Sequence, residues 1–498
     1  MQNITWNNEP PLKYLIYAIG IFVLCYSTFR AAIIPITHDE SYTYIICVPY
    51  SLWEIVTYDN NYNANNHILN TLLMRLSIEI FGNAEWVLRL PNLIGHFLYI
   101  FFSIRIVKST FSWTYLGLLA VILVNFNPYV VDFFSVARGY GLAMGMMITS
   151  VYFFLSFLKN KEAKYWIISL VFGFLAVWSN FIYLLYFVSL VTIYAVLELE
   201  RYFRSRQSFT ALLRSQIIGL LGFVSVAAVI VGPILKLREL KEFRFGGSSS
   251  FFQDTYKVLL EYSLYDNRYF GPGTDEFFLV FILILLVGSS LLILAQHVTS
   301  KKLMMENPKI LFLLFGFFLM LISIIQHHLL GAAYLTGRRS IIFIPFAAFV
   351  LCVGLLGLEK YAKNVSRFLG LATLLFSLFH FTYNMKSYDS IMQWAFDKDT
   401  KEVLRIMKTQ ADAMNKFSIK LEVDFLMKNS INFYQKTQNL GWLEPMQYKT
   451  SEVKGEGADF YYIFAANKSK ITDHVETVFY SNGRVLLKRL STHTKDTQ

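Results

Sequence analysis

Long apolar segments alternate with short polar ones along most of this 498-residue chain. Eleven of these segments are about 16 to 24 residues long, close to the length that a helix needs to cross the hydrocarbon layer of a membrane. They lie at 13–34, 87–107, 113–130, 140–158, 165–180, 181–198, 212–235, 276–297, 309–330, 340–358 and 367–384. The pattern predicts a polytopic α-helical membrane protein with about eleven transmembrane helices.

The composition agrees with this class, because 55% of the residues are hydrophobic and 16% are charged. The net charge of +11 does not indicate nucleic-acid binding, since many of the basic residues lie in short loops between apolar segments, where they set membrane orientation. The three cysteines are scattered, so the sequence indicates neither a disulfide framework nor a thiolate metal site.

The distribution of basic loops also predicts the orientation. Loops that contain Lys159, Lys164 and Lys360 fall on one side of the membrane if the N-terminus is cytoplasmic. We therefore expect a multi-pass protein of the plasma (inner) membrane, with residues 35–86 and everything after about residue 385 on the outer face.

The first outer loop, residues 35–86, is too long to be a simple connection. It contains two helix-like stretches, Ser41–Ile55 and Asn66–Phe81, which we expect to lie on the membrane surface. The polar segment Tyr58–Asn66 lies between them and is interpreted either as a binding loop for a head group or as a solvated loop.

The composition changes after the last apolar segment. Helical patterning is followed by strand-like runs such as Phe460–Phe464, and Asn482-Gly483 is a typical hairpin turn. The chain is therefore divided into a transmembrane domain, residues 1–384, and a small soluble extracytoplasmic α/β domain, residues 385–498. We expect the second domain to shape or cap the active face.

Two adjacent carboxylates, Asp39 and Glu40, follow the first apolar segment. An acidic pair beside hydrocarbon is energetically costly, so its presence favours a functional role. The alternative is that the pair begins the helix that follows, because acidic residues are favoured in the first turn. The two interpretations are compatible.

Four motifs together resemble a known family. They are the Asp39-Glu40 pair, Phe81–Pro91, Ala137–Ala143 and Gly337–Pro345. In this order and with this membrane sidedness, they are similar to those of the GT-C membrane glycosyltransferases, in the branch that holds protein O-mannosyltransferases and lipid A aminoarabinose transferases.

The resemblance implies a GT-C fold and an inverting transfer of a sugar, a hexose or a pentose, from a polyprenyl-phosphate donor. The acceptor would be a glycan, lipid A or a protein at the outer face of the membrane. Asp39 would be the catalytic base, and its carboxylate is suited to this role because it is ionised at neutral pH. Glu40 would orient the acceptor or hold a divalent cation.

The leaving group would be a lipid phosphate, whose negative charge requires cations near the outer interface. The candidate substrate-binding residues are therefore His67, Arg138, Tyr140, Arg338 and Arg339, with one member of the last pair expected to act. The alternative for each is an ordinary interfacial residue.

Cofactor use stays open at this point. Asp39, Glu40 and His67 could form a metal site, but their spacing follows no strict ligand pattern, so no metal is required and a divalent cation is not excluded. A rival function is a polytopic lipid or sugar transporter or flippase, although the sequence shows neither an internal repeat nor a central acidic residue. A third is a membrane scaffold that presents the C-terminal domain.

Overall fold

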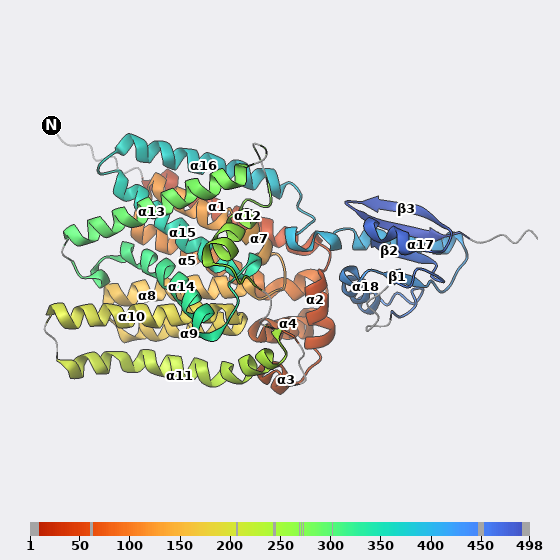
Figure 1. Ribbon diagram of the computed structural model, residues 1–498, viewed down its shortest axis with the longest axis horizontal. Coiled ribbons are helices and arrows are strands. Elements are labelled where there is room, and N and C mark those ends of the chain that lie inside the picture. The colour runs from red at the N-terminus through yellow and green to blue at the C-terminus, as the bar shows by residue number, and fades with distance from the viewer. Residues whose placement is uncertain are drawn as a thin grey trace, which may run out of the picture.

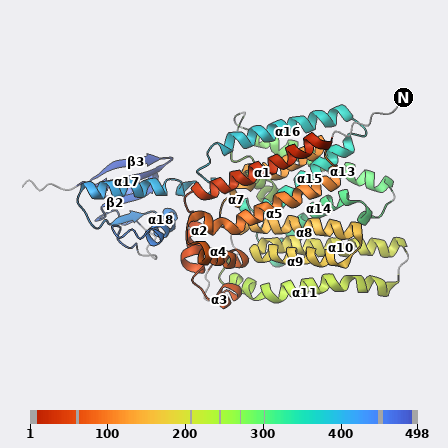
Figure 2. The ribbon, with the colours of Figure 1, turned by 180° about the vertical axis from the view of Figure 1, so that it is seen from behind.

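The computed structural model describes residues 9–59, 63–205, 208–242, 246–267, 269, 271, 273–300, 302–446 and 453–490. A bundle of long helices makes up most of the molecule, and a small domain built around a sheet lies at one end of the bundle (Figure 1). The first described helix, Glu9–Ile33, begins towards the opposite end, as the reverse view also shows (Figure 2).

Nine helices in the described part of the chain are long and apolar enough to cross a membrane. Some of these spans include the short 3-10 helices η2 (Phe181–Tyr183) and η6 (Gly337–Phe343). The main helices are α1 (Glu9–Ile33), α5 (Glu85–Phe111), α8 (Tyr140–Asn160), α10 (Leu184–Ser205), α11 (Phe209–Glu239), α13 (Thr274–Ser300), α14 (Pro308–Leu330), α15 (Ile344–Leu358) and α16 (Lys363–Met385). The chain is a multi-pass membrane protein, as predicted.

The other two predicted spans differ from straight helices of full length. The segment 113–130 forms a pair, α6 (Tyr115–Asn125) and α7 (Pro128–Phe134), bent by 58°. Asn127 caps α7 with its side chain and the following proline lacks an N–H, so a new helix begins there. The segment 165–180 forms the shorter apolar helix α9 (Ala163–Ser179).

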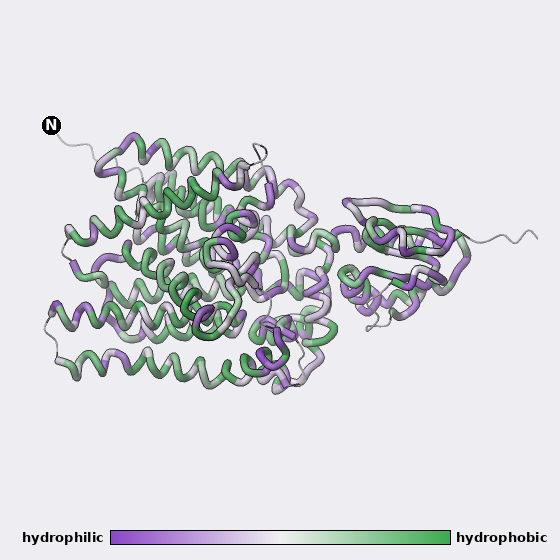
Figure 3. Tube along the Cα trace, viewed as in Figure 1, coloured by the Kyte–Doolittle hydropathy of each residue, from purple (hydrophilic) through white to green (hydrophobic). Residues whose placement is uncertain are grey.

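Helix α8 packs closely on both α5 and α9. A Cβ atom on Gly145 of α8 would lie 2.2 Å from the carbonyl oxygen of Gly95 on α5, so the two backbones touch where glycine allows it. By contrast, α11, α13 and α16 carry exposed apolar side chains such as Leu220, Ile284 and Phe368. The hydropathy view shows the bundle as largely apolar and the C-terminal end as more polar (Figure 3).

The outer loop after α1 contains α2 (His38–Tyr42), the short π-helix η1 (Thr43–Cys47), α3 (Leu52–Thr57) and α4 (Ile68–Phe81). The second expected surface helix is confirmed as α4. The first, over Ser41–Ile55, is broken: Pro49 lacks an N–H, and Ser51 caps a new helix together with Glu54. Of the polar segment between them, residues 60–62 lie outside the described residues.

The C-terminal domain begins with the 3-10 helix η7 (Met392–Asp397). It continues with α17 (Thr400–Ala413), β1 (Leu421–Val423), α18 (Phe425–Thr437), β2 (Phe460–Phe464), β3 (Val475–Ser481) and β4 (Arg484–Arg489). The strand order is β1-β2-β4-β3, with β1 and β2 parallel and the other neighbours antiparallel. The hairpin predicted at Asn482-Gly483 is confirmed, with a positive φ at both residues. Helix α18 packs on α2, so this domain contacts the outer loop directly.

Candidate active site

Asp39 lies in α2 at the end of the bundle that faces the C-terminal domain (Figure 1). The Thr37 side chain caps this short helix, and the side chain of Glu40 bonds back to the Thr37 amide. The Oδ2 atom of Asp39 lies 3.0 Å from Nη1 of Arg338 and 3.3 Å from Nη2 of Arg138. The structure thus brings three of the predicted site residues together around one oxygen atom.

The two arginines control the charge of this carboxylate. Burial by itself would raise the pKa of Asp39, but Arg138 and then Arg338 outweigh it and lower the pKa to about 2. Asp39 is therefore ionised at neutral pH although only 9% of its surface is exposed. An anionic oxygen held in a mostly buried position is suited to accept a proton once its counter-charges are shared with another anion.

The backbone directly after Arg138 needs a glycine. Gly139 has a φ of +67°, and a Cβ there would lie 2.4 Å from the carbonyl oxygen of Ser179. The guanidinium is almost fully buried and donates to the side-chain oxygen of Asn65 at 2.8 Å. Its Nε atom has no hydrogen-bond partner in the described part of the chain. Arg138 therefore retains donor capacity for a ligand.

Two buried asparagines connect the helices that support this turn. Asn92 of α5 donates to the side chain of Asn70 on α4 and accepts from the amide of Leu142 on α8. Asn70 in turn donates to the carbonyl oxygen of Ala137. Because unpaired amides are costly in a low-dielectric interior, this network fixes the position of Arg138 relative to α4 and α5.

The structure distinguishes the two late arginines. Arg338, which precedes α15, contacts Asp39 and lies over the ring of Trp394 in η7, 5.1 Å from its centroid. Arg339 donates instead to the Thr336 hydroxyl at 2.9 Å. Arg338 is thus the member of the pair that contacts the candidate base.

Glu40 has surroundings that the sequence did not predict. It is fully buried, forms a two-pronged pair with Arg89 at 2.8 Å for each bond, and accepts the backbone amides of Ala137 and Thr37. These four hydrogen bonds occupy both of its oxygens. They favour a structural role, in which Glu40 joins the turn of Asp39 to α5 and to the segment that carries Arg138.

His67 and Tyr140 lie beside the arginines. Their rings are 5.6 Å apart, and His67 occupies the N-cap position of α4 without capping it through its side chain. Burial, followed by the charge of Arg138, lowers the pKa of His67 well below its usual value. Its Nε2 atom is buried and has no hydrogen-bond partner among the described residues. A neutral imidazole with an unpaired nitrogen is a candidate contact for substrate.

The candidate metal ligands do not form a metal site in the described part of the chain. Within the described residues, no group of three or more His, Cys, Asp or Glu side chains could hold a metal ion. Asp39, Glu40 and His67 were potential metal ligands in the sequence. In the structure the Asp39 carboxylate contacts two arginines, and both oxygens of Glu40 accept hydrogen bonds from Arg89 and backbone amides.

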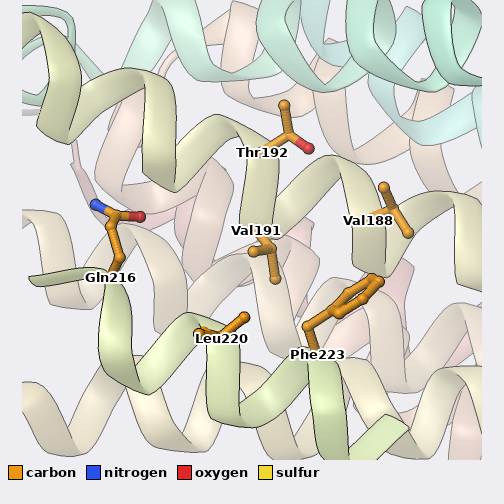
Figure 4. Close-up of a pocket in the computed structure, with 6 residues that line it drawn as sticks. All are labelled: Val188, Val191, Thr192, Gln216, Leu220 and Phe223. Atoms are coloured by element: carbon orange, nitrogen blue, oxygen red, sulfur yellow. The ribbon is translucent and has the colours of Figure 1, made fainter. Parts of the chain in front are cut away.

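An apolar groove elsewhere in the bundle does not belong to this site. It has a volume of about 310 Å³ and lies between α10 and α11 (Figure 4). It is lined by Val188, Val191, Thr192, Gln216, Leu220 and Phe223. Its lining includes none of the candidate site residues.

Several residues of the site carried little signal in the sequence. Trp394 comes from the C-terminal part of the chain and was not distinguishable from other aromatic residues. Asn70 and Asn92 did carry a signal, because an amide within an apolar helical face is unusual. Asn65, which contacts Arg138, belongs to the polar segment that was predicted as a potential head-group loop.

The comparison with protein families agrees with this arrangement. Residues 67–228 match the family model of dolichyl-phosphate-mannose-protein mannosyltransferase. The match covers about a third of the chain and includes His67, Arg138 and Tyr140, whereas Asp39 and Arg338 lie outside it. For this segment it confirms the resemblance to the mannosyltransferase branch of the GT-C family.

Two solved structures are similar to the chain over nearly its whole length. One is ArnT from Cupriavidus metallidurans bound to undecaprenyl phosphate, with 10% identity, a TM-score of 0.47, and coverage of 96% of this chain and 98% of that one. The other is the same protein in the apo state, with 11% identity, a TM-score of 0.46, and coverage of 95% and 97%. No curated protein matches the chain.

Proposed function

We propose that this protein is an inverting glycosyltransferase that moves a sugar from a polyprenyl phosphate to an acceptor hydroxyl or amine at the outer face of the plasma (inner) membrane. The observation that carries the proposal is the placement of Asp39 between Arg138 and Arg338, 3.3 Å and 3.0 Å away, at one end of a membrane bundle. A base and two cations in one place are what a transfer with an anionic phosphate leaving group requires.

The transfer is a single displacement. The acceptor oxygen or nitrogen forms a bond to the anomeric carbon from one side, and the bond from that carbon to the phosphate oxygen breaks on the other side. Asp39 takes the acceptor proton, and the phosphate leaves with the electron pair and is stabilised by Arg138 and Arg338. His67 and Tyr140 contact the donor beside Arg138, Arg339 contributes positive charge near the same interface, and Glu40 holds the turn of Asp39.

The distribution of basic loops supports an orientation with a cytoplasmic N-terminus. In this orientation the C-terminal domain lies outside together with Asp39, because that domain and α2 occupy the same end of the bundle (Figures 1 and 2). The acceptor is a glycan, lipid A or a protein that reaches this end of the molecule.

The test is a transfer assay with the full-length protein in liposomes. Labelled polyprenyl-phosphate hexoses and pentoses are incubated with cell-envelope extract and wild type, Asp39→Asn or the control Glu79→Gln. Glu79 is an exposed carboxylate of α4 in the same outer loop, and its ion pair with Arg75 at 3.0 Å lies at the surface, where such pairs contribute little to stability. We expect loss of transfer in Asp39→Asn alone.

Equal transfer by wild type and Asp39→Asn would contradict the assignment of the base. Movement of the labelled lipid across the bilayer by wild type without formation of a glycosidic bond would favour the transporter interpretation instead.

A further inference from the structure

The C-terminal domain forms hydrogen bonds with the turn that carries Asp39. The amide of His38, the residue before Asp39, donates to Oδ2 of Asp397 at 2.7 Å. Two residues earlier, the amide of Ile36 donates to the hydroxyl of Tyr434 at 2.9 Å. Asp397 ends η7 and Tyr434 lies in α18, so two elements of the C-terminal domain hold the backbone on the N-terminal side of the candidate base.

The side chain of His38 is held by the same domain. Its Nδ1 lies 2.8 Å from the carbonyl oxygen of Leu426, and its Nε2 lies 3.1 Å from the side-chain amide of Asn429. The ring also packs against Phe425 at a centroid distance of 5.4 Å. A neutral imidazole that donates from Nδ1 and accepts at Nε2 satisfies both contacts.

Asp397 is itself fixed inside the domain. It is 1% exposed, and its Oδ1 accepts the hydroxyl of Ser430 at 2.6 Å. Burial raises the pKa of Asp397 well above its usual range, and the nearby charges of Asp39 and Glu40 raise it further. Burying a carboxyl group costs free energy of folding. Such a group, bonded to the backbone beside a candidate reacting residue, is typical of a functional site.

We propose that Asp397 is a positioning residue for the transfer reaction, through which the C-terminal domain holds the Asp39 carboxylate in place between the two arginines. The proposal rests on the function proposed above. Helix α2 has only five residues, too few to be stable alone, so its orientation depends on the groups that hold its first turn. Loss of the bond at His38 displaces the next residue, and a shift of about 1 Å at a reacting group costs up to a hundred-fold in rate.

The experiment compares three variants of the full-length protein. Asp397→Ala removes the acceptor for the His38 amide. Asp397→Asn keeps an acceptor oxygen there, and its amide can donate to Ser430. Asp399→Asn is the matched control for a loss of stability, because it removes the charge of a buried carboxylate two residues away that pairs with Arg484 within the domain, 2.5 Å distant.

We expect Asp397→Ala to lower kcat about ten- to a hundred-fold, while the affinity for undecaprenyl phosphate stays at or above the wild-type level, because Arg138 and Arg338 remain in place. Asp397→Asn restores most of the turnover. Asp399→Asn leaves the buried Arg484 without its anionic partner and lowers stability, but the folded protein keeps turnover near the wild-type level. If Asp397→Ala does not fold, Ser430→Ala is the milder variant and lowers kcat in the same direction. Turnover at the wild-type level in Asp397→Ala, or an equal loss in Asp399→Asn, would overturn the proposal.

A second measurement separates this proposal from the proposed function. Amide hydrogen exchange is followed in the peptide over residues 34–41, without substrate. Faster exchange in Asp397→Ala but not in Asp399→Asn supports the proposal that Asp397 fixes the turn at His38, even if wild type transfers no sugar. Unchanged exchange in Asp397→Ala overturns it even if wild type is active.

Discussion

Asp39 and Arg338 are 299 residues apart in the sequence, yet Nη1 of Arg338 donates to Oδ2 of Asp39 at 3.0 Å. The same oxygen is 3.3 Å from Arg138. The candidate base therefore shares its counter-charges with any phosphate that enters the site, and the three groups form one coupled unit.

Removing one of these cations should change the pH dependence of the reaction. Arg138 and Arg338 lower the pKa of Asp39 to about 2, so this carboxylate should cause no acidic loss of kcat/KM between neutral pH and about pH 4. In Arg338→Gln the pKa of Asp39 rises, and the acidic limb moves to higher pH. The measurement is kcat/KM against pH, with Arg75→Gln as the control; superimposable profiles would refute the coupling.

Removing the base should strengthen the binding of a lipid phosphate. Asn at position 39 no longer neutralises Arg138 and Arg338, so both are available to the phosphate. We expect Asp39→Asn to bind undecaprenyl phosphate about tenfold more tightly, which corresponds to about 1.4 kcal/mol. Binding is measured by titration in detergent at fixed salt. Weaker binding than in wild type would show that Asp39 itself contacts the lipid.

Glu40 should be important for stability more than for chemistry. In Glu40→Gln the Arg89 guanidinium stays buried without its anionic partner, and breaking such a pair costs about 3 to 5 kcal/mol. Thermal unfolding in detergent should show a clear fall in the midpoint, whereas the exposed Glu79→Gln control should change little. A variant that keeps wild-type stability but loses transfer would support the role first expected from the sequence, with Glu40 at the acceptor or a cation.

Asp397 should make stability depend on pH. Because its pKa is raised in the folded protein, its contribution to the free energy of unfolding is complete below about pH 3.9 and is lost as the pH rises. Asp397→Asn carries no charge to bury, so it should gain stability relative to wild type as the pH rises from 4 to 7. The measurement is the unfolding midpoint of wild type and Asp397→Asn at several pH values from 4 to 7. A constant difference between the two midpoints would contradict the prediction.

Nine of the eleven predicted spans are confirmed as helices long and apolar enough to cross a membrane, whereas 113–130 is a bent pair and 165–180 is a shorter helix. Apolar length is a local property and needs no tertiary information. The break at Pro49 is also readable from the sequence, because a proline cannot continue the hydrogen bonding of a helix, and the expectation of one helix over Ser41–Ile55 was wrong.

The site was less accessible to sequence reasoning. The resemblance named Asp39, Arg138 and the late arginine pair, but only the folded chain shows that Arg338 contacts Asp39. The capping role of Glu40 followed from its position, whereas its bonds to Arg89 required the approach of α5. Contacts from the C-terminal domain, such as that of Asp397 with His38, left no local pattern that could have predicted them.

Gly95 of α5 and Gly145 of α8 are in contact within the helix bundle, and the same two helices extend to the end of the bundle that carries Asp39 and Arg138. Helix α5 carries Arg89, which holds the turn of Asp39, and α8 begins two residues after Arg138, so the packing of these two helices connects the candidate base to the cation. A small molecule or a bulkier side chain wedged at the glycines would push these two charged groups apart from a distance. Inhibition of such a protein therefore does not require occupation of the substrate site.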